Sequence, residues 1–149
     1  MNKLPALCFA LAFALPVLAE PSKAEMIVAN PDSLHWKAKE ALPKGAFGAV
    51  VHGDPAKGDY DFIARFPAHY TVPEHFHTNE MFVTMLKGSM TLARAGQPDV
   101  TVLEGGFFSL PAGMRYVARC EKECTFQVHG AQPFDLLYVD EKDDPRKHR

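Results

Sequence analysis

The sequence predicts an all-β protein, folded as a sandwich or a barrel. From Phe47 onward, short segments rich in apolar and β-branched residues recur at nearly regular spacing. Turn-forming residues separate them, as in the stretch from Gly53 to Gly58. Many short strands divided by turns are typical of all-β sandwiches and barrels. The expected strands span residues 47–52, 60–66, 71–76, 81–86, 89–93, 100–103, 107–110, 115–120, 125–129 and 134–139.

The first 19 residues have the pattern of a secretory signal peptide. Lys3 precedes an apolar run, and small residues end the segment at Ala19. The run is shorter than the roughly 20 apolar residues that span a bilayer, which argues against a membrane anchor. We therefore expect an exported protein, periplasmic or secreted, from which residues 1–19 are removed.

The remaining chain has the size of one domain. Removing the first 19 of the 149 residues leaves 130, enough for one core. Of the 16 lysines and arginines only Lys3 is lost, which leaves 15 against 18 acidic residues. This balance does not favour a nucleic acid or a membrane surface as partner. We expect an N-terminal extension over 20–45, a barrel over 46–140 and a charged, solvated tail over 141–149.

One segment of the extension has helical character. Asp32 or Ser33 can cap a helix N-terminus, and residues 33–42 follow without a glycine or proline. We expect at least one helical turn there, packed on the outside of the barrel.

Two cysteines, Cys120 and Cys124, follow the signal segment. In an oxidising compartment such a close pair predicts a disulfide, with two free buried thiols as the alternative. The flanking strands resemble a hairpin, so the bond would join adjacent strands. In that register Arg115 opposes His129, on the face away from Tyr116. The closed loop is short, which puts the stabilisation at the low end of ~2–4 kcal/mol.

The most informative pair in the chain is His75 and His77. Side chains two residues apart on a strand point to the same face. Two imidazoles on one face, with the carboxylate of Glu80 nearby, suit a metal or polar site better than an apolar core.

These residues belong to a larger pattern, through which the sequence resembles the cupins. Cupins carry two motifs, G-x5-H-x-H-x3-E-x6-G and then G-x5-P-x-G-x2-H. The matching residues are His75, His77 and Gly88 in the first motif and Gly105, Pro111 and Gly113 in the second. The resemblance covers nearly all of the chain after residue 19. It implies a jelly-roll-like cupin β-barrel preceded by a short N-terminal extension.

The sequence departs from the cupin pattern at two of four metal ligands. In metal-binding cupins the two first-motif histidines, the first-motif glutamate and the second-motif histidine hold one divalent metal. Here His75 and His77 are kept, whereas Met81 replaces the glutamate and Tyr116 replaces the last histidine. Glu80 stands one position before Met81. The resemblance therefore implies a degenerate ligand set.

Each departure leaves alternatives open. Glu80 completes a set of two histidines and one carboxylate, as in non-haem iron sites, if the preceding turn slips by one residue. On a regular strand it points away from the pocket. Met81 is either a thioether ligand beside the imidazoles, which would favour copper, or an apolar side chain that fills the barrel. Tyr116 either donates to a bound oxygen atom or serves as a general acid, or it is a core tyrosine with a satisfied hydroxyl.

Two functions fit these observations. The first is an exported single-domain cupin that binds a small-molecule ligand, with a weakly held divalent metal (iron, manganese, zinc or copper) at His75 and His77. The second is a metal-dependent enzyme of the oxygenase or isomerase type, which uses Glu80 as a third ligand and Tyr116 as acid or oxyanion donor. An apolar or aromatic ligand is expected if the cavity is lined by Val83, Met85, Phe107 and Phe126. Cupins commonly form homodimers through sheet surfaces, so a homodimer is expected as well.

Overall fold

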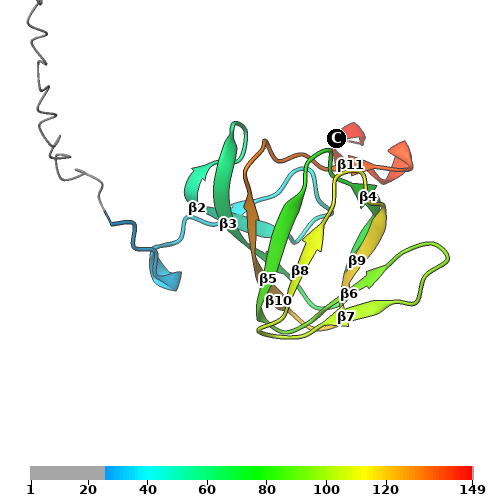
Figure 1. The fold of residues 1–149 in the computed structure, drawn as a ribbon, viewed down its shortest axis with the longest axis horizontal. Helices are drawn as coiled ribbons and strands as arrows, with labels where there is room; N and C mark the ends of the chain where they lie inside the picture. The colour runs from blue at the N-terminus through cyan, green and yellow to red at the C-terminus, as the bar shows by residue number, and fades with distance from the viewer. Residues whose placement is uncertain (1–25, 149) are drawn as a thin grey trace, which may run out of the picture.

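The computed structural model describes residues 26–148, which form two antiparallel β-sheets around one core (Figure 1). The six-stranded sheet has the order β1-β2-β3-β10-β5-β8, and the five-stranded sheet has the order β11-β4-β9-β6-β7. The strands are β1 (Lys37–Ala38), β2 (Phe47–Asp54), β3 (Gly58–Phe66), β4 (Tyr70–Phe76), β5 (Met81–Lys87), β6 (Met90–Ala93), β7 (Val100–Val102), β8 (Phe107–Leu110), β9 (Tyr116–Cys120), β10 (Cys124–Gly130) and β11 (Leu137–Tyr138). The predicted all-β fold is confirmed.

Alternating burial along the strands explains why these segments form sheets. In β3 and β10 every second side chain is buried, because successive residues of a strand point to opposite faces. Phe62 and Ala64 of β3 thus face the core together with Phe126 and Val128 of β10, which are their Cα partners in reverse order. The inner faces of the two sheets together make the core.

The expected hairpin between residues 115–120 and 125–129 is wrong. Strand β9 pairs with β4 and β6, whereas β10 pairs with β3 and β5, so the two strands belong to different sheets. Each already has two neighbours, which leaves no edge for the other. The predicted disulfide is present, with 2.16 Å between the sulfurs of Cys120 and Cys124. It joins the two sheets rather than two adjacent strands.

The helix expected over residues 33–42 does not form. A 3-10 turn spans Pro31–Ser33, and the chain then adds β1 to the edge of β2, where Lys37 pairs with Gly48. The backbone groups on the free edge of β2 offer this segment hydrogen bonds, and such tertiary pairing overrides a weak helix preference. Trp36 packs outside the sheet, with the Arg65 guanidinium 4.4 Å from its ring centroid.

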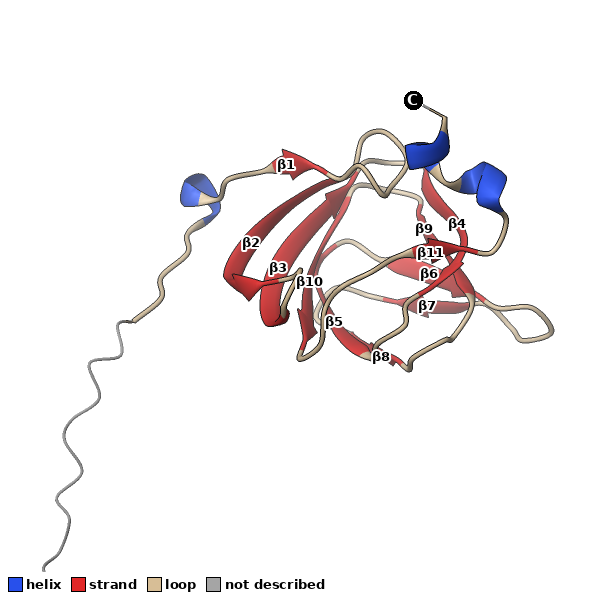
Figure 2. Ribbon diagram, turned by 90° about the horizontal axis from the view of Figure 1, so that it is seen from above, coloured by secondary structure: helices blue, strands red, loops and turns tan. Residues whose placement is uncertain are grey.

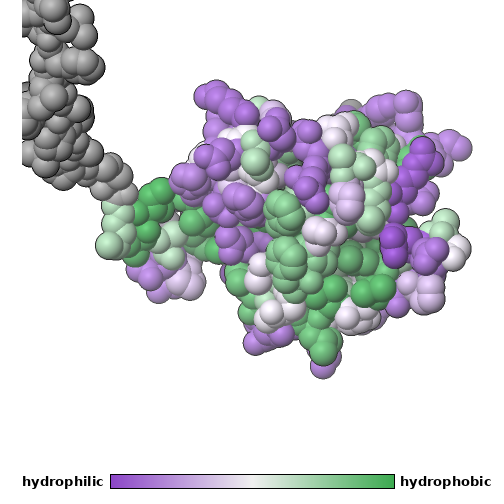
Figure 3. Space-filling model, viewed as in Figure 1, coloured by the Kyte–Doolittle hydropathy of each residue, from purple (hydrophilic) through white to green (hydrophobic). Residues whose placement is uncertain are grey.

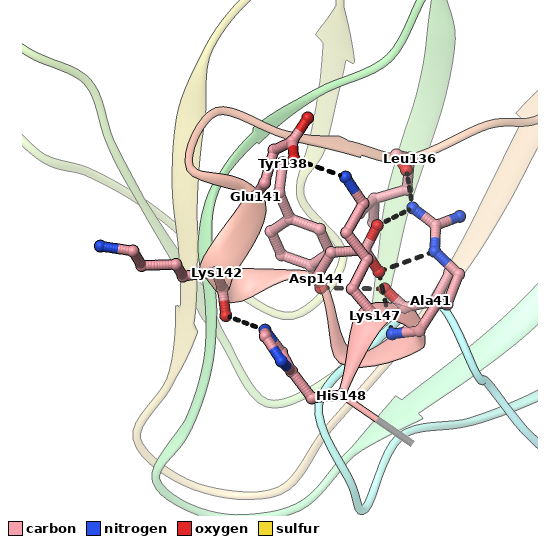
Figure 4. Close-up of polar contacts among 9 residues, drawn as sticks. Ala41, Leu136, Tyr138, Glu141, Lys142, Asp144, Lys147 and His148 are labelled. Atoms are coloured by element: carbon pink, nitrogen blue, oxygen red, sulfur yellow. Dashed lines mark hydrogen bonds and ion pairs between the residues drawn. The ribbon is translucent and has the colours of Figure 1, made fainter.

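The extension also covers one end of the barrel. The Tyr138 hydroxyl donates to the Ala41 carbonyl at 2.9 Å (Figure 4), and the Tyr70 hydroxyl donates to the Pro43 carbonyl at 2.5 Å. Both tyrosine rings are buried, and both hydroxyls therefore need partners. These two bonds hold residues 41–43 against the five-stranded sheet.

The charged C-terminal tail is mostly exposed, as expected, but one residue anchors it to the barrel. Two 3-10 turns, Glu141–Asp143 and Pro145–Lys147, lie beside β4 at one end of the barrel (Figure 2). Between them Asp144 is buried and accepts two hydrogen bonds from the Arg146 guanidinium, which also donates to the Leu136 carbonyl. Mainly because of these bonds, the pKa of Asp144 is lowered to about 2.

The surface carries apolar as well as polar areas, and Figure 3 shows apolar residues across the middle of one face. Large apolar side chains with substantial exposure include Phe47, Val50, Leu86 and Phe107. A homodimer stays a prediction, which sedimentation of the purified protein tests. No helix among residues 26–148 is long and apolar enough to cross a membrane.

Candidate functional site

A cavity of about 240 Å³ lies between the two sheets. Most of its lining is apolar, and residues 39–42 of the extension cover part of it. Three buried polar side chains face it, namely His75, His77 and Tyr116. The apolar lining includes Phe62, Val72, Val83, Met90, Leu110, Phe126, Phe134 and Leu136. Pockets that combine an apolar wall with a few polar groups are typical small-molecule sites.

Neighbouring strands of one sheet bring the polar groups together. His75 in β4 pairs with Tyr116 in β9 on one side and with Tyr138 in β11 on the other. Directly opposed residues share a face, so the ring centroids of His75 and Tyr116 lie 4.3 Å apart. His77 follows the end of β4, and its ring centroid is 5.3 Å from that of His75.

Backbone carbonyls fix the tautomers of both histidines. His75 Nδ1 lies 2.8 Å from the Pro73 carbonyl oxygen, and His77 Nδ1 lies 2.5 Å from that of Asp135. A carbonyl oxygen only accepts hydrogen bonds, so Nδ1 carries the hydrogen in each ring. In the neutral imidazoles Nε2 is then the acceptor, and the Tyr116 hydroxyl donates to His77 Nε2 at 2.9 Å.

Burial keeps all three groups neutral near pH 7. It lowers the pKa of His75 to about 4, with a further contribution from the neighbouring His77. Burial also lowers the pKa of His77, although its bond to the Asp135 carbonyl and the Asp135 charge oppose the shift. The pKa of Tyr116 is raised far above its ordinary value, because the phenolate would have no water around it.

The two remaining predicted ligands lie on opposite sides of the strand that begins at Met81. Met81 is buried and lines the cavity, whereas Glu80 is exposed and does not. The turn before β5 keeps the regular alternation, which sends neighbouring side chains to opposite faces. Within residues 26–148, no group of three His, Cys, Asp or Glu side chains is arranged to hold a metal ion.

The expected apolar lining is partly wrong. Val83 and Phe126 line the cavity, whereas Met85 is buried in the core outside the lining. Phe107 is 61% exposed on the outer face, and its neighbour Phe108 faces the cavity instead. The cause is the register between β5 and β8, which pairs Val83 with Phe108 and so gives these two the same inward face.

His129 lies outside the cavity, as the sequence analysis predicted, although the register behind that prediction was wrong. It is exposed on the outer face of the six-stranded sheet, where its Nδ1 is 3.3 Å from the Asp61 carboxylate. His52 and Gln127 contact the same carboxylate. Asp61 thus gives each of the three neighbouring polar side chains a partner on the surface, away from the cavity.

Sequence reasoning missed the residues that orient the histidines. Pro73 and Asp135 act through their carbonyl oxygens, which every residue type has, so their side chains give no signal for this contact. The Asp135 carboxylate fastens the same loop by accepting from the Thr78 backbone N–H at 2.8 Å and from the Thr78 hydroxyl at 2.5 Å. A proline inside a strand does signal local irregularity, and the β4–β9 register shifts between Val72 and His75.

Comparison with known proteins identifies the fold. No protein-family model and no curated protein matches the sequence. Among solved structures, the polyketide cyclase RemF from Streptomyces resistomycificus is similar with a TM-score of 0.69 and 20% identity, over 83% of this chain and 92% of that one. An RmlC-like cupin from Ralstonia eutropha gives 0.60 and 22%, over 77% and 73%. This chain has the cupin fold.

Another solved structure of similar shape carries a different activity in its name. A putative acetylacetone dioxygenase from Methylibium petroleiphilum has a TM-score of 0.64 and 22% identity, over 85% of this chain and 90% of that one. At such identities the similarity establishes the fold, and the chemistry has to be argued from the site itself.

Proposed function

We propose that this cupin binds a small, mostly apolar organic molecule in its barrel, with His75 as the main polar anchor. The observation that carries the proposal is an apolar cavity of about 240 Å³ into which a buried imidazole presents an unused nitrogen. Among residues 26–148, His75 Nε2 has no hydrogen-bond partner, while its Nδ1 is held by Pro73. No fully buried side-chain nitrogen or oxygen of the described residues lacks a partner, so this unpartnered nitrogen is open to the cavity, where a ligand or water can donate to it.

The donor set does not fit a tightly bound divalent metal. Such sites in proteins use three or more ligands, commonly with a carboxylate beside two histidines. Here the lone pair of His77 Nε2 already accepts from Tyr116, whose phenolate form is strongly disfavoured. Glu80 lies outside the cavity. No observation therefore favours the metal-dependent enzyme over the binding protein.

The weakly held metal expected at His75 and His77 stays a prediction with a direct test. Metal analysis compares the wild type with His75→Ala/His77→Ala after incubation with iron, manganese, zinc or copper. Under this proposal the wild type holds far less than one equivalent after dialysis. Near-stoichiometric metal that disappears in the double variant would contradict the proposal and favour the enzyme.

Export is the second part of the proposal. The signal-peptide pattern in residues 1–19 lies outside the described residues and supports it from the sequence alone. The Cys120–Cys124 disulfide supports it independently, because such bonds persist mainly in oxidising compartments. Fractionation of producing cells and N-terminal sequencing test it, and a mature protein that begins at Glu20 in the exported fraction is the expected result.

Calorimetric titration with indane, a compact bicyclic hydrocarbon, tests whether the cavity accepts an apolar molecule. The matched variants are Ala118→Leu, which places three carbons in the cavity, and Val50→Leu, which enlarges an exposed side chain elsewhere. Binding by the wild type and by Val50→Leu, but not by Ala118→Leu, is expected. Failure of the wild type to bind, or equal binding by all three proteins, contradicts a ligand site in the barrel.

A further inference from the structure

The three buried polar side chains of the cavity, which all come from the five-stranded sheet or its end, share one property that limits the ligand. His75 Nδ1 is committed as a donor to the Pro73 carbonyl, so His75 Nε2 offers only a lone pair. The Tyr116 hydroxyl gives its single hydrogen to His77 Nε2, so the Tyr116 oxygen also offers only lone pairs. His77 itself has no free atom left, because both ring nitrogens are bonded.

From this pattern we infer that the ligand of this cupin carries a hydroxyl group that donates its hydrogen to His75 Nε2. The ligand class is an apolar alcohol, phenol or enol, rather than a ketone or an aldehyde. This inference rests on the proposed ligand-binding function and adds the direction of the hydrogen bond, in which the ligand donates and His75 accepts.

The backbone enforces this polarity. A donor at His75 Nε2 would require the hydrogen to leave Nδ1, which would leave two lone pairs facing each other at 2.8 Å across the bond to the Pro73 carbonyl. If Tyr116 turned its hydroxyl toward a ligand, His77 Nε2 would lose its donor in a buried position. Losing the partner of a buried acceptor costs about 1–3 kcal/mol. The Pro73 and Asp135 carbonyls that hold the two histidine rings are backbone groups, and a backbone carbonyl can only accept a hydrogen bond.

Ketone and aldehyde ligands are disfavoured beside His75 for the same reason. Their oxygens accept hydrogen bonds, and beside His75 and Tyr116 they would meet further acceptors. Lys39 is a cationic donor in the lining, and its ammonium lies 5.4 Å from the Phe62 ring centroid. Lys39→Met removes this donor, and the preference for a hydroxyl ligand should persist in that variant. Lys87→Met, which removes an exposed ammonium outside the lining, is the control that should leave the ligand preference unchanged.

Racemic 1-indanol and 1-indanone make a matched test, because they share a carbon skeleton and differ in whether the oxygen can donate. We expect 1-indanol to bind about tenfold tighter than 1-indanone by calorimetry, the ratio that corresponds to one buried hydrogen bond. A ketone that binds as well as the alcohol, while indane also binds, overturns the inference and leaves the proposed function standing. If none of the three compounds binds, both fail.

Two variants assign the preference to particular atoms. His75→Asn keeps an amide N–H near the position of Nδ1 and removes the distal acceptor, so most of the tenfold preference should disappear. Tyr116→Phe frees His77 Nε2 as a second acceptor, so the preference for 1-indanol should persist. If Tyr116→Phe instead weakens only 1-indanone, Tyr116 is a donor to the ligand and the inference is wrong. Circular dichroism confirms that each variant is folded, and the comparison in the wild type stands without them.

Discussion

Filling the cavity should stabilise the protein, and Ala118→Leu is the sharpest way to show it. Ala118 is 4% exposed, lies in the middle of β9 and lines the cavity. Leucine adds three carbons, each worth about 0.8 kcal/mol when buried, which gives about 2.4 kcal/mol. Fixing the leucine rotamer costs about 0.5–1 kcal/mol. The free energy of unfolding should therefore rise by about 1–2 kcal/mol.

Ala46→Leu is the matched control, because Ala46 is buried in the core at 2% exposure but does not line the cavity. The same three carbons there meet packed neighbours, and overpacking usually costs about 1–3 kcal/mol. Urea unfolding followed by fluorescence measures both variants against the wild type. If Ala118→Leu is destabilised as much as Ala46→Leu, the space between the sheets is not available and the proposed ligand site is wrong.

Three further predictions concern stability. In metal-free protein the unfolding free energy should fall by up to about 3 kcal/mol as the pH drops from 6.5 to about 4, because the unfolded chain binds a proton at His75 that the folded chain, with its lowered pKa, does not. Urea titrations at several pH values check this. If the unfolding free energy of His75→Asn depends on pH as that of the wild type does, His75 is not the cause. Cys120→Ser/Cys124→Ser should lose about 2 kcal/mol by the chain-entropy relation for so short a loop, and an unchanged urea midpoint would contradict a disulfide in the wild type. Tyr138→Phe should cost about 1 kcal/mol and increase amide exchange around Ala41, whereas unchanged exchange would mean that this hydroxyl does not hold the extension.

The strands were predictable because each is encoded locally. Alternating burial in a segment such as β10 is visible in the sequence as alternating apolar and polar residues. The sheet to which a strand belongs is a different matter, since it depends on which partners are free. Nothing in the short loop between Cys120 and Cys124 distinguishes a hairpin from a crossing between sheets. The helix expected over 33–42 failed for a related reason, because the open edge of β2 lies outside that segment.

The site was predictable in its positions and less so in its chemistry. His75, His77, Met81 and Tyr116 all line one cavity, so the motif spacing located four wall positions correctly. The hydrogen-bond partners of the rings are backbone carbonyls that come from a strand irregularity and from a distant loop. Those contacts depend on tertiary structure, and they decide which imidazole nitrogen faces the cavity.

The replacement of a histidine by Tyr116 changes the site more than the loss of one ligand would. A histidine at this position would leave His77 Nε2 free, whereas the phenol hydroxyl takes up that lone pair at 2.9 Å. The tyrosine at position 116 thus removes two of the four metal ligands that the cupin motif supplies, and Met81 replaces the charged ligand, the glutamate. The buried polar groups that remain between the sheets are neutral acceptors in a mostly apolar cavity, and they suit a hydroxylated apolar molecule better than a cation.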